Sequence, residues 1–163
     1  NFFKKEKIKR LEIKWPNDIL SYNKKFCGIL CESIINKHLV NKLIIGIGIN
    51  VNQISFEGLP NACSIRKILK KEINLDSFTR RLIQNIKKNI SFFEDTPKIK
   101  SFKIFNNYLD NLCGYGTIKS YKISGGSKIE AEIVGLNRDG SLKMKLINGE
   151  IKMYNFNDIQ LIF

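Results

Sequence analysis

The sequence predicts an α+β fold, and three features of its pattern indicate this. Strand-like apolar runs occupy most of the first fifty residues, two amphipathic helix patterns follow, and the last fifty residues hold short strands joined by glycine-containing turns. With 163 residues and 43% hydrophobic content, the chain can form one moderate domain and a small additional one. We place the boundary near Cys113–Gly114, which gives a domain of residues 1–113 and a smaller domain of residues 114–163.

The first segments are short and lead into an unusual turn. Residues 2–10 are typical of the end of a helix, and residues 11–14 of a short strand. Proline fixes its own φ and disfavours a helical conformation in the preceding residue, so Trp15-Pro16 predicts a rigid turn. The only tryptophan, an amide and a carboxylate are neighbours in residues 15–18. This combination suits a phosphate or a nucleotide, and a well-built loop is the alternative interpretation.

Two longer strand patterns follow this turn. Residues 19–22 and 25–35 flank Asn23-Lys24, a turn-compatible pair, and predict a β-hairpin. Residues 43–51 are β-branched and apolar, which predicts a central strand. The only histidine, His38, falls in a turn.

Three helices are predicted in the middle of the chain. Ser64 is placed to cap a short helix ending at Leu69, Asp76 to cap a long helix, and Pro97 suits the first turn of a third. The two longer helices each carry an apolar stripe, which we assign to the core. These stripes are Phe78, Leu82, Ile83, Ile86, Ile90 and Phe93 in the first, and Ile99, Phe102, Phe105, Tyr108, Leu109 and Leu112 in the second.

After Gly114 and Gly116 the pattern changes to short strands. Asp139-Gly140 and Asn148-Gly149, each between two strand patterns, are strong hairpin signals. Such a series of short strands predicts a small closed or partly open β-barrel. The strand-like runs are residues 117–124, 128–136, 141–147 and 150–154.

The chain is strongly basic, with a net charge of +13. Such a charge normally points to nucleic acid or an anionic surface as a partner. Lysine, isoleucine and asparagine are abundant along the whole length, however, which is typical of a compositional bias and not of a binding footprint. The densest basic stretch, residues 4–10, is interpreted as a solvated helix end. We therefore do not expect nucleic acid to be a main partner.

The four cysteines, Cys27, Cys31, Cys63 and Cys113, have no metal-ligand spacing and predict buried free thiols in a reducing cytosol. We expect no metal held by protein ligands. No apolar run reaches the length of a membrane span, so we expect no membrane association, and no signal peptide is recognisable. Because the sequence begins with Asn1 inside a helix-like segment, we expect it to be a piece of a longer protein.

Along residues 43–51, the alternation of side chains in a strand places two glycines, which have no side chains, on one face. Gly46, Gly48 and Asn50 share that face, and Ile45, Ile47, Ile49 and Val51 share the other. Two glycines on one face of a strand indicate a bulge or a close approach to the backbone. A flat ligand on this face and a packed helix are both consistent with the pattern.

In the predicted hairpin, alternation places Lys25, Cys27, Ile29 and Cys31 on one face, with Gly28 opening the backbone beside it. A lysine at the start of this strand is suited to supply positive charge to an oxyanion or a phosphate. An ordinary surface lysine is the alternative.

Three of these segments together resemble one family, the biotin protein ligases (biotin–[acetyl-CoA-carboxylase] ligases). The loop at residues 60–64, the helices and the terminal barrel also look like the family, so the resemblance covers essentially the whole chain. The resemblance implies a mixed β-sheet with helices, similar to the core of class II aminoacyl-tRNA synthetases, followed by a small Src-homology-type β-barrel. The matching segments, in the family's order and spacing, are Lys14-Trp15-Pro16-Asn17-Asp18, Lys25-Phe26-Cys27-Gly28-Ile29-Leu30-Cys31-Glu32 and Ile45-Gly46-Ile47-Gly48-Ile49-Asn50-Val51-Asn52.

The resemblance implies a ligase reaction in two steps. Biotin and ATP would form biotinyl-5′-adenylate with loss of pyrophosphate, and biotin would then pass to one lysine of the biotin carboxyl carrier protein domain of acetyl-CoA carboxylase. By position, Lys25 and Asp18 match the family's catalytic residues: Lys25 would contact the biotin carboxylate and the α-phosphate, and Asp18 would lie near the acceptor lysine. Mg²⁺ would neutralise the phosphates without a dedicated protein site.

The resemblance also assigns the binding residues. Biotin would be bound by Lys25, Gly28, Ile29, Gly46 and Gly48. The nucleotide side would be formed by Lys14, Trp15, Asn17, Asp18 and Asn50. The implied location is the cytoplasm, and the sequence leaves a homodimer open.

The chain departs from the family in two respects. Cys27 and Cys31 stand where small or aliphatic residues are usual, which should only repack the sheet. The family's Arg-Gly-rich loop, which closes over biotin and the adenylate, and the strands that recognise the biotin ring belong before Asn1. We therefore expect that the chain does not form biotinyl-adenylate by itself, and that its sheet has an unpaired edge prone to aggregation.

Two other classes of function remain open. A lipoate or octanoyl transferase would share the fold and the acyl-lysine chemistry, although the Lys14–Asp18 block argues against it. A non-enzymatic basic module that binds nucleic acid or carries biotin is favoured by the charge and the terminal barrel.

Overall fold

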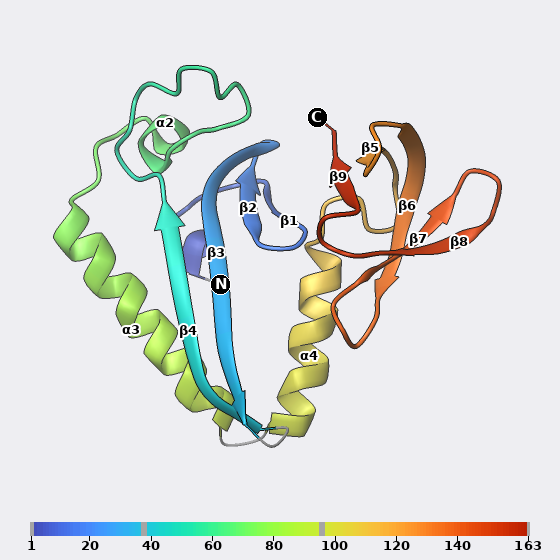
Figure 1. Cartoon of the computed structure of the whole chain (residues 1–163). Coiled ribbons are helices and arrows are strands. Elements are labelled where there is room, and N and C mark those ends of the chain that lie inside the picture. Colours follow the sequence, from blue (N-terminus) through green and yellow to red (C-terminus); the bar gives the residue numbers. More distant parts are fainter. Residues whose placement is uncertain (1, 37–38, 95–96, 163) are drawn as a thin grey trace. The chain divides into compact units, whose positions relative to one another are not determined.

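The structure is a computed structural model that describes residues 2–36, 39–94 and 97–162. These residues form two compact units, which we describe separately. Lys14–Pro16 belongs to the second unit together with residues 97–162, and the other described residues up to 94 form the first. The chain is of the predicted α+β class (Figure 1).

The first unit contains a four-stranded sheet in the order β1-β2-β3-β4. Its pairs β2–β3 and β3–β4 are both antiparallel. Lys25 and Ala62 add an isolated parallel bridge in this region. The elements of this part of the chain are α1 (Phe2–Lys5), β1 (Leu11–Lys14), β2 (Asp18–Ser21), β3 (Lys24–Asn36), β4 (Leu39–Ile49), α2 (Ile65–Leu69) and α3 (Leu75–Glu94).

The predicted hairpin is confirmed as β2–β3, but its turn differs by one residue. The two connecting residues are Tyr22 and Asn23, whose φ angles are 51° and 60°, and Lys24 already belongs to β3. A two-residue connection with both φ angles positive matches the right-handed twist of the strands, which explains this position of the turn.

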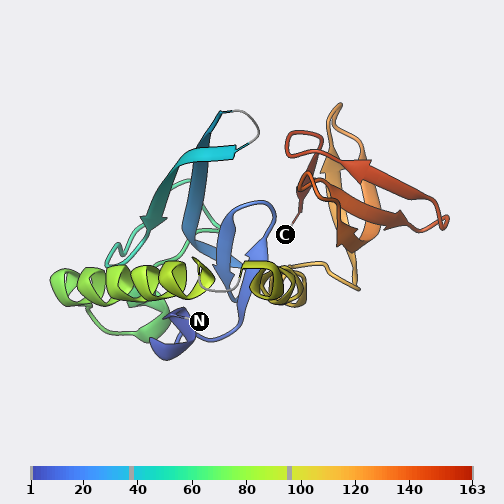
Figure 2. The same ribbon diagram turned by 90° about the horizontal axis from the view of Figure 1, so that it is seen from below.

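Strand β4 was expected to be central, and this expectation is wrong for the described sheet. β4 stands at the end of the strand order, beside β3 alone. Figures 1 and 2 show β3 and β4 as a long hairpin, one part of which extends away from α3. Both faces of this hairpin are largely exposed, and its large exposed side chains are Leu30, Ile34, Leu43, Ile44, Ile45 and Ile47.

The core of the first unit is aromatic. Phe3 meets Phe26 edge to face at 5.0 Å between ring centroids, and Phe2 meets Phe78 at 5.4 Å. The core therefore joins α1, β3 and the first turns of α3. Its buried members are Phe2, Phe3, Ile8, Phe26, Cys27, Cys63, Ile65, Ile73 and Phe78.

Of the two predicted N-terminal caps, one is confirmed and the other is wrong. Ser64 caps α2 as expected, because its Oγ accepts a hydrogen bond from the Lys67 N–H at 3.2 Å. The cap of α3 is Asn74 and not Asp76, since Asn74 Oδ1 accepts from the Ser77 N–H at 2.9 Å. Asp76 lies inside the first turn of the helix.

The apolar stripes of the two long helices are only partly core. Phe78 is buried and Leu82 packs against the core, but Ile83 and Ile90 are exposed. In α4 (Pro97–Asp110), Leu109 is buried, whereas Phe102 and Phe105 are exposed. Helical spacing predicts one apolar face correctly, but it does not show that a partner covers the whole face.

The second unit contains α4 and a five-stranded antiparallel sheet in the order β8-β7-β6-β5-β9. The predicted hairpins at Asp139-Gly140 and Asn148-Gly149 are confirmed, and both glycines have positive φ. A closed barrel remains a prediction, as does the domain boundary after Cys113, which would separate α4 from this sheet. The strands are β5 (Ile118–Ile123), β6 (Lys128–Leu136), β7 (Leu142–Leu146), β8 (Ile151–Tyr154) and β9 (Ile159–Leu161).

The thiols are as predicted with one exception. All four cysteines are free, and three are buried, but Cys31 is exposed on the projecting β3–β4 hairpin. The predicted turn at His38 lies outside the described residues. None of the described helices combines the length and the apolar character that a membrane crossing requires.

Candidate functional site

Asp18 in β2 and Lys25 in β3 form an ion pair across the β2–β3 hairpin. The Lys25 Nζ and the Asp18 Oδ1 are 2.6 Å apart, and the two side chains are 50% and 18% exposed. Asp18 is paired with Gly28 across the two strands. The structure therefore brings together the two residues that were predicted to be catalytic.

A bulge decides which way Lys25 points. The register steps from Ile19–Cys27 to Leu20–Lys25, so Phe26 has no direct partner and the alternation of side chains is interrupted. The Lys25 ammonium consequently lies on the Gly28 side of the sheet, while Cys27 packs into the core. The prediction that Lys25, Cys27 and Ile29 share one face is therefore wrong, because it assumed an uninterrupted strand.

Gly28 lies directly beside the ion pair. A Cβ at Gly28 would lie 3.4 Å from Asp18 Oδ1 and 3.5 Å from Lys25 Nζ. The register continues this row into β4, where Gly28 is paired with Gly48 and Leu30 with Gly46. Bare backbone thus lies directly beside the charged pair, and Gly46 and Gly48 are exposed.

The backbone of Lys25 is held by the loop before α2. The Lys25 N–H donates to the Asn61 carbonyl at 2.7 Å, and the Cys63 N–H donates to the Lys25 carbonyl at 2.8 Å. Asn50 braces the same loop, because its Nδ2 donates to the Cys63 carbonyl at 3.1 Å. Sequence reasoning did not assign this support to Asn61 or Cys63, since only backbone atoms of these residues take part.

A second backbone contact links two predicted binding residues. The Ile29 N–H donates to the Asn17 carbonyl at 2.9 Å, so the two residues lie next to each other. The side chain of Ile29 packs against the core. Ile29 therefore directs its side chain towards the core and not towards the exposed glycines.

Cys27 lies next to the ion pair but is not suited to act as a nucleophile. Its side chain is buried, and burial raises the pKa of the thiol from 9.0 to about 12, to which the Asp18 charge also contributes. The thiolate is the nucleophilic form of cysteine. Near neutral pH, Cys27 therefore remains a protonated core residue.

Trp15 belongs to the second unit. Its Nε1–H donates to the Gly140 carbonyl at 3.0 Å, and its ring meets Phe156 at 6.1 Å between centroids. The carbonyl of Pro16 accepts a hydrogen bond from the Tyr108 hydroxyl at 3.1 Å. Lys14 belongs to the same unit. The predicted nucleotide residues therefore fall into two groups, Lys14 with Trp15 in the second unit and Asn17, Asp18 and Asn50 in the first.

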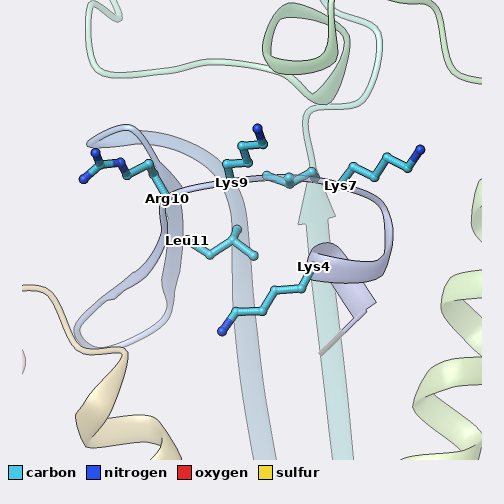
Figure 3. A pocket seen from close by; sticks show the side chains of 6 residues that line it. Lys4, Lys7, Lys9, Arg10 and Leu11 are labelled. Carbon is cyan, nitrogen blue, oxygen red and sulfur yellow. The ribbon is translucent and has the colours of Figure 1, made fainter.

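The basic stretch after α1 borders a hollow of about 500 Å³ (Figure 3). Its cationic side chains point in different directions and do not converge on one point (Figure 3). Lys7 and Arg10 have positive φ angles of 64° and 50°, which turn the chain sharply after the helix. The hollow is lined by Lys4, Lys7, Ile8, Lys9, Arg10 and Leu11. The expectation that nucleic acid is not a main partner stays a prediction.

The residues that the structure describes contain no cluster of three histidine, cysteine, aspartate or glutamate side chains that could hold a metal ion. Asp18 offers a single carboxylate, which pairs with Lys25. Magnesium in nucleotide sites is commonly held by one or two carboxylates together with substrate phosphates. A single carboxylate is compatible with a magnesium ion that arrives bound to a nucleotide.

The sequence is similar to known ligases. Residues 4–50 match the model of the Biotin/lipoate A/B protein ligase family. The bifunctional ligase/repressor BirA of Bacillus spizizenii is 31% identical over 163 residues, which cover 92% of this chain and 46% of that protein. BirA of Bacillus subtilis is 60% identical over 42 residues, or 26% of this chain and 13% of that protein. The chain thus spans less than half of the length of these two relatives.

Solved structures of biotin protein ligases are also similar to this chain. The apo biotin protein ligase of Aquifex aeolicus is similar with a TM-score of 0.72 and 25% identity, covering 99% of this chain and 69% of that one. The same enzyme in complex with biotin and ATP matches with a TM-score of 0.72 and 27% identity, covering 99% and 66%. The chain therefore shares the fold of about two thirds of this biotin protein ligase structure.

Proposed function

We propose that the chain belongs to the biotin protein ligase family and takes part in the ATP-dependent attachment of biotin to a lysine of a carrier protein. One observation carries the proposal: the Lys25–Asp18 pair, 2.6 Å apart beside Gly28, lies within the segment that matches the family model. The bound biotin and ATP of the Aquifex aeolicus enzyme support these two substrates. The activity is proposed for a whole ligase, of which this chain forms part.

Lys25 acts in the first step. A carboxylate oxygen of biotin attacks the α-phosphorus of ATP, an O–P bond forms, and the bond to the pyrophosphate leaving group breaks. Two anions must approach each other, so a fixed cation between them lowers the barrier. The Lys25 ammonium is half-exposed and is held in place by Asp18, so it is accessible to both anions.

Asp18 acts in the second step. The amine of the acceptor lysine attacks the acyl carbon of biotinyl-5′-adenylate, a C–N bond forms, and the C–O bond to AMP breaks. The attacking amine must also lose a proton. A carboxylate near this amine attracts the lysine and accepts its proton, which is the role we assign to Asp18.

We assign biotin to the exposed glycines. Gly46 and Gly48 have no side chains to obstruct a ring that approaches the β3–β4 surface, and Gly28 continues this surface to the ion pair, which supports this assignment. We assign the nucleotide to Asn17, Asp18 and Asn50 of the first unit, and by the resemblance in sequence also to Lys14 and Trp15. Magnesium would arrive with ATP and neutralise its phosphates.

The proposed partner is the biotin carboxyl carrier protein domain of acetyl-CoA carboxylase. The four free cysteines favour the reducing cytoplasm as the location. The exposed edge of β4 would also allow two copies to associate, so we keep a homodimer as part of the proposal.

A chimaera tests this function. The chain replaces the matching part of the Aquifex aeolicus ligase, with which it shares the fold, and pyrophosphate release and labelling of a carrier domain are measured. We expect both to depend on biotin and ATP. Lys25→Ala should lower the rate of adenylation by about 100-fold, because it removes the charge between the two anions, whereas Lys24→Ala on the adjacent position should leave it nearly unchanged.

Three outcomes would contradict parts of the proposal. A folded chimaera without adenylation would refute the function. Labelling with lipoate in place of biotin would favour the transferase, a candidate that the family model also covers. Turnover by the isolated 163-residue chain would refute only the expectation that it needs further residues.

A further inference from the structure

The core of the first unit contains two consecutive residues of β3. Phe26 is 0% exposed, and Cys27 is buried in the same core. In an uninterrupted strand, neighbouring side chains point to opposite faces, so only one of these two could reach the core. The bulge removes this restriction, because Phe26 has no direct partner on β2. The burial of both side chains therefore depends on the bulge.

A register without the bulge would turn the lysine the other way. Lys25 would then share the core face with Cys27. Phe26 would lie on the exposed face, beside Gly28. This register would remove a phenyl ring from the core and bring an ammonium group towards it, and both changes are unfavourable. The burial of Phe26 consequently selects the register that directs Lys25 to Asp18.

The ring of Phe26 contacts Phe3, a residue of α1. The two rings meet edge to face, with 5.0 Å between their centroids and 85° between their planes. The helix α1 is followed by Glu6, whose two carboxylate oxygens each accept a hydrogen bond of 2.9 Å from Arg81 in α3. Phe3 thus contacts the bulge residue from a segment that is itself held in place.

Two backbone hydrogen bonds depend on the position of the bulge. The Asn50 N–H donates to the Phe26 carbonyl at 2.8 Å, and the Cys63 N–H donates to the Lys25 carbonyl at 2.8 Å. A shift of the bulge would move both acceptors away from their donors. The hydrogen exchange of these two amide protons therefore reports whether the bulge is retained.

We propose that Phe3 is a positioning residue, which holds the bulge at Phe26 and thereby directs Lys25 towards the site. The proposal rests on the proposed function, because Lys25 is assigned to the adenylation step. Phe3 lies in the core and contacts no reacting atom. The direction of the charged group thus depends on an apolar ring from another element of the first unit.

Hydrogen exchange of the 163-residue chain, followed by NMR, tests the contact. Phe3→Leu truncates the ring that meets Phe26. Phe78→Leu is the control, since it makes the same change in the same core at a ring that meets Phe2. We expect the two amide protons to exchange at least about fivefold faster in Phe3→Leu than in Phe78→Leu, because loss of the contact lets the bulge open locally. Equal exchange in the two variants would overturn the proposal.

A coupling measurement separates positioning from packing. In the chimaera, Phe3→Leu should slow adenylation at saturating substrates by about tenfold, because a misplaced catalytic group can cost up to about 100-fold in rate. In the Lys25→Ala background, the same substitution should change the rate by less than about twofold, since the group that Phe3 positions is absent. An equal loss in both backgrounds would show that Phe3 only supports the fold and would overturn the positioning role, as would an unchanged rate in Phe3→Leu.

A second variant guards against a failure to fold. If Phe3→Leu lost the circular dichroism spectrum of the unchanged chain, Phe26→Leu would make the same change on the other side of the contact, with the same exchange and coupling expected. If the unaltered chimaera released no pyrophosphate, the proposed function would fail, while hydrogen exchange would still decide whether Phe3 holds the bulge.

Discussion

Gly28 and Gly114 differ in how strongly their surroundings require a glycine. A Cβ at Gly28 would touch Asp18 and Lys25 only at ordinary contact distances, so space alone does not require a glycine there. Gly114 is required by the backbone, because its φ of +90° disfavours other residues and a Cβ would collide with the Tyr121 hydroxyl. That hydroxyl is buried and has no hydrogen-bond partner within the described part of the chain.

Gly114→Ala should therefore destabilise the protein strongly. We expect a loss of about 2 kcal/mol or more in the free energy of unfolding, from backbone strain and steric overlap together. Gly135→Ala is the control, since no atom lies within 4 Å of its Cβ position and its φ is not positive. Urea denaturation followed by circular dichroism measures both. Equal midpoints for the two variants would show that the strain at Gly114 is absent.

At the scale of the element, the start of α3 shows which cap the structure uses. Asn74 accepts the Ser77 N–H, and just before it Asn52 bonds to both the N–H and the carbonyl of Ile73, at 2.9 and 2.7 Å. The helix thus begins at a point fixed by two asparagine side chains. Asp76, two positions into the helix, contributes through the helix dipole alone.

Asn74→Ala should cost about 1 kcal/mol in the free energy of unfolding, the usual cost of removing an N-cap. Asp76→Ala should cost less, about 0.3 to 1 kcal/mol, and its effect should shrink in high salt because it is electrostatic. Urea denaturation at low and high ionic strength distinguishes the two. A larger loss in Asp76→Ala would mean that Asp76 is the cap.

The elements of the chain were predictable where the signal is local. The Asn-Gly and Asp-Gly hairpins and the Ser64 cap follow from backbone preferences of a few residues. The direction of Lys25 was not predictable, because a bulge depends on how two strands match over their whole length. The exposure of the projecting β3–β4 hairpin depends equally on what packs against it.

At the scale of the whole molecule, the described cationic side chains lie on several separate elements and are not concentrated in one patch. The cations around the hollow near α1 point apart (Figure 3), and further lysines line β7 and β8. Charge of this kind acts through the general field of the protein.

We therefore expect that no single basic patch controls retention on nucleic acid. The combined variant Lys7→Ala, Lys9→Ala and Arg10→Ala should reduce retention on a heparin or DNA column only as much as Lys143→Ala, Lys145→Ala and Lys152→Ala, which removes the same charge elsewhere. The salt concentration at elution is the measurement. A clearly larger reduction in the first variant would reveal a specific anion site at the hollow.

The buried thiol and phenol groups predict how stability depends on pH. The pKa of Cys27 is raised from 9.0 to about 12 and that of Tyr108 from 10.0 to about 12, so the folded protein keeps protons that the unfolded chain releases. The contributions of these two groups to stability are fully present below their ordinary pKa values. As the pH rises, the contribution of Cys27 should fall above about pH 9 and that of Tyr108 above about pH 10, each by up to about 1.4 kcal/mol per pH unit.

Unfolding in urea between about pH 8 and pH 10.5 measures this slope. Cys27→Ala should make the slope shallower, whereas Cys31→Ala, which alters an exposed thiol, should leave it unchanged. Equal slopes in the unchanged chain and in Cys27→Ala would contradict the assigned burial of the Cys27 thiol.

The sequence by itself determined the fold class, the resemblance to the biotin protein ligases and the choice of Lys25 and Asp18 as site residues. It could do so because turn chemistry, apolar periodicity and the Lys14–Asp18 block are local properties of neighbouring residues. Only the tertiary structure decided that Lys25 points towards Gly28 and that Tyr108 holds the Pro16 carbonyl. These depend on strand register and on contacts between residues up to 92 positions apart, and neither is encoded in any short stretch of the chain.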